Sequence, residues 1–161
     1  MKTEEFLRTV TALPGVTGNE RAAAEYIADC KEMGIALLHP DVNASEDRFT
    51  VETEGIRFGL GAVKNIGIGL VRQMVEERER NGAFSSLENF AERMQETDLN
   101  KRAVENLIKC GAMDCFGLNR AQLLFIYEGV LDGAADRRRR TLSGQLALFD
   151  MLPEHEQPAT P

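Results

Sequence analysis

The chain has 161 residues, enough for about one domain of common size, and 43% of them are hydrophobic and 28% charged. No apolar run approaches the roughly 20 residues that span a bilayer, which predicts a cytoplasmic protein without a membrane partner. The net charge of −7 speaks against a large nucleic-acid surface, but the acidic excess lies mainly in residues 1–53. The overall charge therefore does not exclude a local basic site in the remainder of the chain.

The first 58 residues are predicted to form two helices and a few short strands. These elements are a helix over 3–13, a helix from the Thr17–Glu20 capping box to Gly34, a strand over 35–39 and a β-hairpin around Glu54–Gly55. The segment "PDVNASED" between the strand and the hairpin is expected to be a turn, because Pro, Asn, Asp and Ser favour turns.

From residue 59 to about 135 the apolar residues recur at helical spacing. Helices are expected to begin near Ser85, at Asn100 and at Asn119, and the last of them covers "RAQLLFIYEGVL". Residues 136–161 lose the periodicity and are predicted to be a disordered tail. The prediction is a mainly α fold with a small β-hairpin (α+β), with Leu60, Val63, Ile66, Leu70, Val71, Met74, Phe90, Leu107 and Ile108 in its core.

The stretch Asn65-Ile66-Gly67 has the layout of a helix-hairpin-helix turn. Asn tolerates positive φ, and the apolar Ile66 can fill the space between the two helices. The second helix would begin at Gly67 to Gly69, and its free N–H groups would suit a DNA phosphate, with Lys64 and Arg72 beside them. The alternative is a plain glycine-rich connection. A nucleotide-phosphate loop is less well supported, because the Gly-Lys-Ser/Thr ending is missing.

The segment "QLALF" at residues 145–149 places apolar side chains in the predicted tail. Such residues are explained if a partner protein buries them, and the alternative is an ordinary apolar linker.

Cys30, Cys110 and Cys115 lack the spacing of a zinc site and are expected to be buried free thiols. No acid, base and nucleophile set can be assembled, so neither a catalytic residue nor a metal or cofactor is expected.

The motifs "PDVNASEDRFTV" and "IRFGLGAVKNIG", followed by "FSSLENFAERM", "LNKRAVENLIKCGAMD" and "NRAQLL", resemble the bacterial replicative DNA polymerase III alpha subunit from about Ala24 to about Met151. The resemblance implies the end of a fingers region over 29–58 and a helix-hairpin-helix domain over 59–135. In the family that domain binds duplex DNA, which carries over to Lys64, Asn65, Ile66, Gly67, Gly69 and Arg72. Many relatives have Gly where this chain has Asn65, and a polar residue where it has Ile68.

The same resemblance implies a sliding-clamp peptide at Gln145, Leu146, Leu148 and Phe149 within the tail over 136–161, and other polymerase III holoenzyme subunits as further partners. The family's palm, which carries the catalytic carboxylates, has no counterpart in this sequence, so the chain is not expected to be an enzyme by itself.

The opening residues 1–23, with "LPGVTGNE", instead resemble the start of metal-dependent aminopeptidases. Residues 1–28 are therefore interpreted as a helical segment of doubtful origin, and the chain as a possible chimera. Two alternatives to the polymerase interpretation are a truncated metallopeptidase-like chimera and a protein-interaction module without DNA binding.

Overall fold

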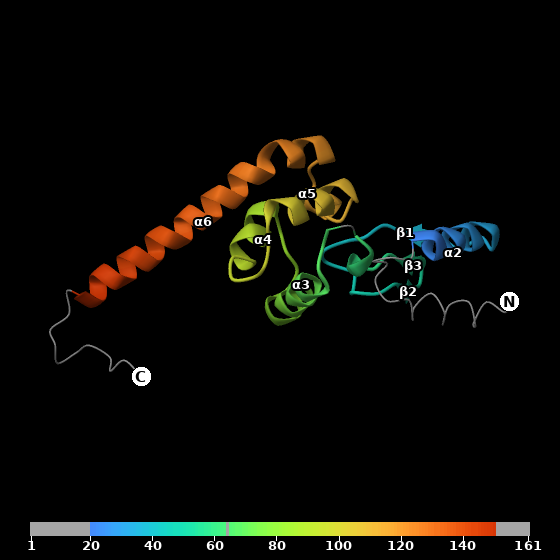
Figure 1. Cartoon of the computed structure of the whole chain (residues 1–161), viewed down its shortest axis with the longest axis horizontal. Coiled ribbons are helices and arrows are strands. Elements are labelled where there is room, and N and C mark those ends of the chain that lie inside the picture. Colours follow the sequence, from blue (N-terminus) through green and yellow to red (C-terminus); the bar gives the residue numbers. More distant parts are fainter. Residues whose placement is uncertain (1–19, 64, 151–161) are drawn as a thin grey trace.

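The computed structural model describes residues 20–63 and 65–150, and it places a small sheet with one helix beside a bundle of helices (Figure 1). The first part holds α2 (Glu20–Glu32), β1 (Leu37–Leu38), β2 (Thr50–Glu52) and β3 (Gly55–Arg57). The second holds the 3₁₀ turn η1 (Leu60–Ala62), α3 (Ile68–Asn81), α4 (Leu87–Arg93), α5 (Lys101–Lys109), the 3₁₀ turn η2 (Asp114–Phe116) and α6 (Arg120–Asp150). This mainly helical α+β architecture confirms the predicted fold class. The helix expected over 3–13 and the Thr17 cap lie outside the described residues.

The sheet has three strands in the order β1-β3-β2. The antiparallel pairing of Val51 with Ile56 confirms the predicted hairpin, and a parallel pairing of Leu37 with Ile56 adds the third strand. Gly55 has a φ of 157°, and a Cβ at this position would lie 2.2 Å from the Ala36 carbonyl oxygen. Glycine is therefore required where β1 approaches β3 so closely.

The main core lies between α3, α4, α5 and α6, and the predicted core side chains gather there. Eight of them are buried, and Val63 is half-buried at the edge of the cluster. Asn100 caps α5 as predicted, since its side chain accepts a hydrogen bond from the Ala103 N–H at 2.9 Å. Helix α4 begins one residue later than expected, because Ser86 and not Ser85 accepts the hydrogen bond from the Asn89 N–H.

The turn between β1 and β2 joins the sheet to the helical bundle. Val42 is fully buried in the helical core, and its N–H donates to the Ala112 carbonyl at 2.9 Å. Asn43 and Phe84 exchange two hydrogen bonds of 2.9 and 2.8 Å, and Arg78 donates to the Val42 carbonyl at 3.1 Å. The turn was predicted from its residue types, but its role as a buried connection was not.

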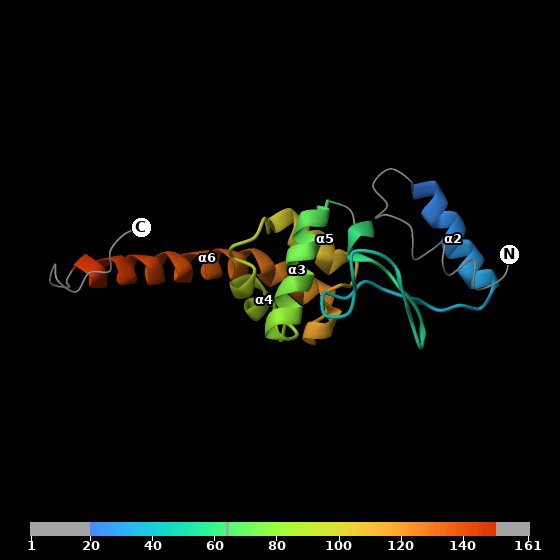
Figure 2. The ribbon, with the colours of Figure 1, turned by 90° about the horizontal axis from the view of Figure 1, so that it is seen from below.

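The predicted disordered tail over 136–161 is wrong for residues 136–150, which continue α6 as far as Asp150. Figures 1 and 2 show this helix leaving the bundle as a straight arm. Residues 139–148 are all exposed, so a helix here has no buried face and needs no apolar periodicity. Arg, Leu, Ala and Gln favour helix in this stretch, and the first proline comes only at Pro153. Residues 151–161 lie outside the described residues.

Candidate nucleic-acid interface

The turn between η1 and α3 reverses the chain at Asn65–Gly67. Among the described residues, Asn65 is the one non-glycine residue with a positive φ, at 62°, and asparagine adopts this left-handed conformation more easily than most residues. Ile66 is only 7% exposed and packs into the helical core. Gly67 then caps α3 without a side-chain hydrogen bond. A single buried side chain thus anchors an otherwise exposed turn.

Neither backbone strain nor internal packing requires the two glycines of this turn, although glycine is a favourable residue at the N-cap position of Gly67. Gly67 has an ordinary φ of −72°, and Gly69 lies within α3. A Cβ added to Gly67 or Gly69 would meet no described atom within 4 Å, and both residues are exposed. Glycine inside a helix costs about 1 kcal/mol relative to alanine. The absent side chains leave the α3 backbone open to close approach from outside.

The charge at the start of α3 suits an anion. The first turn contains no acidic residue, so the positive end of the helix dipole is not neutralised there. Arg72 follows in the next turn; it is exposed, and within the described part of the chain it makes no ion pair. Ile68 is 44% exposed, so this turn faces outward although Ile68 is apolar. The other predicted cation, Lys64, lies outside the described residues.

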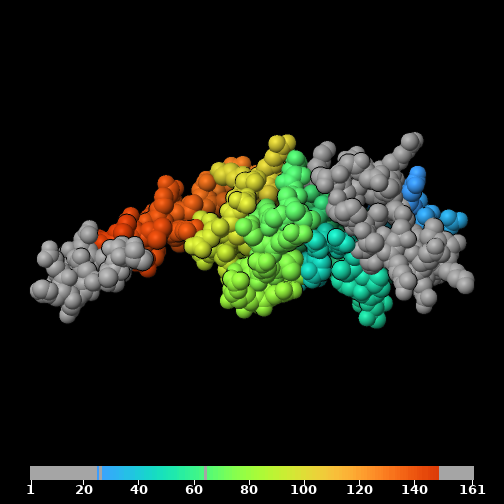
Figure 3. Space-filling view, turned by 60° about the horizontal axis from the view of Figure 1, so that its bottom comes forward, coloured from blue at the N-terminus to red at the C-terminus, as the bar shows by residue number. Residues whose placement is uncertain are grey.

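One basic residue beside the turn was not predicted. Lys109, at the end of α5, lines a hollow of about 570 Å³ together with Val63, two residues before Asn65. Its amino group pairs with Glu105 of the same helix at 2.6 Å. In the sequence Lys109 reads only as a basic residue in a last helical turn, so no local signal places it here. Figure 3 shows α3, in green, at the surface of the molecule.

The predicted peptide "QLALF" lies near the end of the α6 arm, far along the chain from the turn at Asn65. Gln145 is exposed, and Leu146 and Leu148 are 66% and 62% exposed. Phe149 belongs to α6, but its side chain is not among those described. The structure therefore presents two separate candidate sites, one on the bundle and one on the arm.

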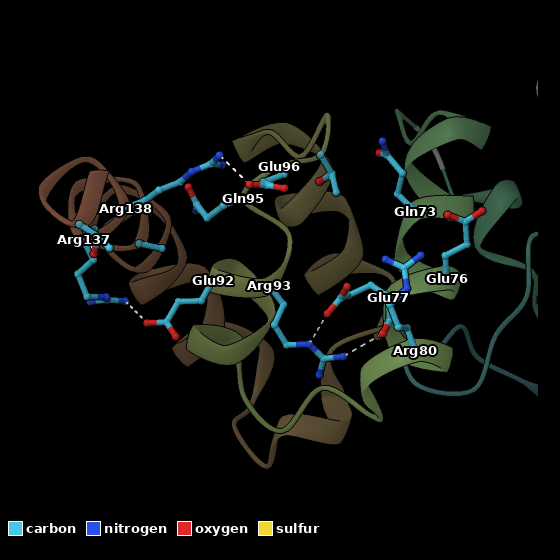
Figure 4. Close-up of a pocket in the computed structure, with 13 residues that line it drawn as sticks. Gln73, Glu76, Glu77, Arg80, Glu92, Arg93, Gln95, Glu96, Arg137 and Arg138 are labelled. Atoms are coloured by element: carbon cyan, nitrogen blue, oxygen red, sulfur yellow. Dashed lines mark hydrogen bonds and ion pairs between the residues drawn. The ribbon is translucent and has the colours of Figure 1, made fainter. Parts of the chain in front are cut away.

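The four arginines before this peptide are mostly engaged within the chain. Arg137 pairs with Glu92 of α4 at 2.8 Å, and Arg138 pairs with Glu96 in the turn after α4 at 2.9 Å, so both ion pairs hold the base of the arm against this part of the bundle (Figure 4). Arg139 pairs with Asp136 at 2.7 Å. Of the four, and counting described partners only, Arg140 alone has no ion pair. This run is therefore less available to a DNA backbone than the sequence indicates.

The cysteines only partly follow the prediction of buried thiols. Cys30 is buried beneath the sheet, Cys110 is half-buried, and Cys115 is exposed, which corrects the prediction for that residue. The Cys115 sulfur itself lies against protein atoms near Asp41. Burial and, second, the charge of Asp41 raise the pKa of this thiol to about 12.

Within residues 20–63 and 65–150, no three His, Cys, Asp or Glu side chains are grouped to hold a metal ion. No helix in the same ranges is long and apolar enough to cross a membrane.

Comparison with known proteins identifies the family to which this chain is similar. A family model described as a helix-hairpin-helix motif matches residues 34–123. DNA polymerase III subunit alpha of Thermus aquaticus is 50% identical over 131 residues, which are 81% of this chain and 11% of the relative. The same subunit is 42% identical in Deinococcus radiodurans (80% of this chain, 10% of the relative) and 39% identical in Saccharopolyspora erythraea (81% and 11%).

The chain spans about a tenth of the length of these curated relatives. The matches support the resemblance read from the motifs, and they give no support to a chimeric origin of residues 1–23.

Proposed function

The chain belongs to the helix-hairpin-helix family, and from this we propose that it binds the phosphate backbone of duplex DNA through the turn over residues 65–69. Its similarity to DNA polymerase III subunit alpha supports a role within a replicative polymerase. The observation that carries the proposal is the pair of exposed glycines, Gly67 and Gly69, which neither backbone strain nor internal packing requires. The N–H groups at the start of α3 would bind a phosphate, and Arg72 would add a second contact.

Such binding is independent of base sequence and weak, because one turn reaches only a few phosphates. The logarithm of the binding constant falls by about 0.9 for each neutralised phosphate per unit logarithm of salt concentration. A slope of roughly −1 to −3 is therefore expected. The acidic surface elsewhere on the chain further reduces the affinity.

The test is fluorescence anisotropy of a labelled duplex titrated with the chain at several salt concentrations. Arg72→Glu is expected to weaken binding and to make the salt slope shallower by about one. Arg80→Glu is the matched control, because Arg80 is an exposed arginine in the last turn of the same helix and has no ion pair among the described residues. Equal effects of the two variants would show general electrostatics and contradict a site at the turn.

A second variant tests the close approach of the DNA backbone. Gly67→Val keeps a φ and ψ that valine adopts freely, and its Cβ meets no described atom within 4 Å. The chain should therefore keep a cooperative urea transition, with stability lowered by about 1 kcal/mol at most because valine is a poorer N-cap than glycine, while its DNA affinity falls several-fold. Unchanged DNA binding by both Gly67→Val and Arg72→Glu would favour an interaction module without a DNA site at this turn.

We also propose that the arm binds the sliding clamp through Gln145, Leu146, Leu148 and Phe149. The exposure of both leucines supports this, since apolar side chains at that position serve no packing within the described chain. Calorimetric titration into a bacterial sliding clamp should show binding that Gln145→Ala with Phe149→Ala abolishes. Leu142→Ala is the control, because Leu142 is an exposed leucine of α6 outside the peptide. Equal loss in both variants would indicate nonspecific apolar contact.

The other partners would be the remaining polymerase III holoenzyme subunits. We propose that the chain does not polymerise DNA by itself, because its sequence offers no pair of metal-binding carboxylates resembling a polymerase palm. Incorporation of labelled nucleotides on a primed template by the purified chain would contradict this.

A further inference from the structure

The helical conformation of residues 145–148 conflicts with simultaneous use of both leucines. Successive residues of an α-helix are rotated by about 100°, so Leu146 and Leu148 project about 160° apart around the axis of α6. A partner surface that lies along one side of α6 can therefore bury only one of the two leucines. In an extended strand, by contrast, residues i and i+2 project to the same side.

We infer that the sliding clamp binds this segment in an extended form and that the end of α6 unwinds when it binds. The inference rests on the clamp-binding part of the proposed function. Once the backbone is extended, Leu146 and Leu148 share one face, and Gln145 and Phe149 flank them on the other. The helix in the free chain is then a competitor of the bound state, and its stability lowers the apparent affinity.

The end of α6 is well suited to such unwinding. Residues 141–148 are all exposed, so no buried contact of a described side chain is lost when the helix opens. Thr141, Ser143 and Gly144 are poor helix formers placed just before the peptide. A short helical segment without tertiary packing is only marginally stable in water. Opening this segment is therefore cheap, and a single substitution can change its cost measurably.

Gly144→Ala provides the test. A Cβ at Gly144 meets no described atom within 4 Å, so the variant adds helix stability without a clash. The expected result in calorimetric titration with the sliding clamp is a dissociation constant three to five times larger than that of the unmodified chain. Gly129→Ala is the matched control, because it makes the same change in the same helix with equal space for the Cβ, but lies before the arm. Its affinity should be unchanged.

Circular dichroism gives an independent readout. The complex should show less helical signal at 222 nm than the sum of the separate proteins, and the deficit should remain in Gly129→Ala. Tighter or unchanged binding of Gly144→Ala, when the unmodified chain binds, would overturn the unwinding inference while leaving clamp binding intact. Failure of the unmodified chain to bind would overturn the clamp-binding proposal and this inference with it.

Discussion

Arg93 joins the end of α3 to α4 and should contribute strongly to stability. Its Nε donates to Glu77 Oε1 at 2.9 Å, and its Nη2 donates to the Gly82 carbonyl at 2.7 Å. Its Nη1 donates to the Ala83 carbonyl at 3.1 Å, and the guanidinium lies 4.4 Å from the centre of the Phe84 ring. The side chain is only 15% exposed, so solvent replaces few of these contacts.

We expect Arg93→Ala to lower the free energy of unfolding by about 3 kcal/mol. The charged hydrogen bond to Glu77 accounts for about 2 kcal/mol of this, because its loss leaves a partly buried carboxylate without its partner. The cation–π contact with Phe84 accounts for about 1 kcal/mol. The exposed carbonyls of Gly82 and Ala83 can turn to water and add little.

Urea denaturation followed by circular dichroism measures this change. Arg93→Lys should lose about 2 kcal/mol, because an ammonium group cannot donate to several carbonyls in one plane. Arg102→Ala is the matched control; Arg102 is an exposed helical arginine without an ion pair among the described residues, and its removal should change stability by less than about 0.5 kcal/mol. A loss below about 1 kcal/mol in Arg93→Ala would refute the assignment of a structural role to this cluster.

Three further results are expected. Ile66→Asp places a carboxylate in the helical core and should abolish the cooperative unfolding transition, so a sharp thermal melt of this variant would contradict the packing of the turn. The hydrogen bond from Arg93 lowers the pKa of Glu77 below its usual 4.5. The ionised Glu77 therefore stabilises the fold above pH 4.5, and this stabilisation is lost as the pH falls through the lowered pKa. The unfolding free energies of the unmodified chain and Glu77→Gln should therefore differ by a constant amount at pH 5–7 and converge below about pH 4.5; a constant difference at all pH values would exclude this pair as the cause. Because the pKa of Cys115 is raised to about 12, its alkylation by iodoacetamide at pH 8 should be about 10³-fold slower than that of a free thiol, and Asp41→Asn should accelerate it; alkylation at the ordinary rate would show that the sulfur is solvated.

The sequence predicted those features that depend on neighbouring residues. The Asn100 cap, the hairpin around Gly55 and the positive φ at Asn65 each follow from a local pattern, and all three are confirmed. The burial of Ile66 also follows from its place between two helical segments.

Features that depend on distant residues were missed. Strand β1 pairs in parallel with β3 although residues 39–54, which include β2, lie between them, and no local signal records such a pairing. The arm of α6 was missed because amphipathic periodicity reports only helices that bury one face. Its ion pairs with α4 and the turn after it, from Arg137 to Glu92 and from Arg138 to Glu96, join residues more than 40 positions apart.

The stiffness of α6 affects how often its end meets a bound partner. The fifteen residues from Asp136 to Asp150 span about 22 Å as a helix, and a flexible chain of equal length has a similar average reach of about 21 Å. While the arm stays helical, the two therefore differ in direction and not in reach, because the helix confines its end to a narrow solid angle, and this constraint is relaxed whenever residues 141–148 unwind. A partner that lies within that angle meets a higher effective concentration of the peptide than a flexible chain would give, and a partner outside the angle meets almost none. Since the ion pairs at the base of the arm are exposed, added salt should widen this angular distribution.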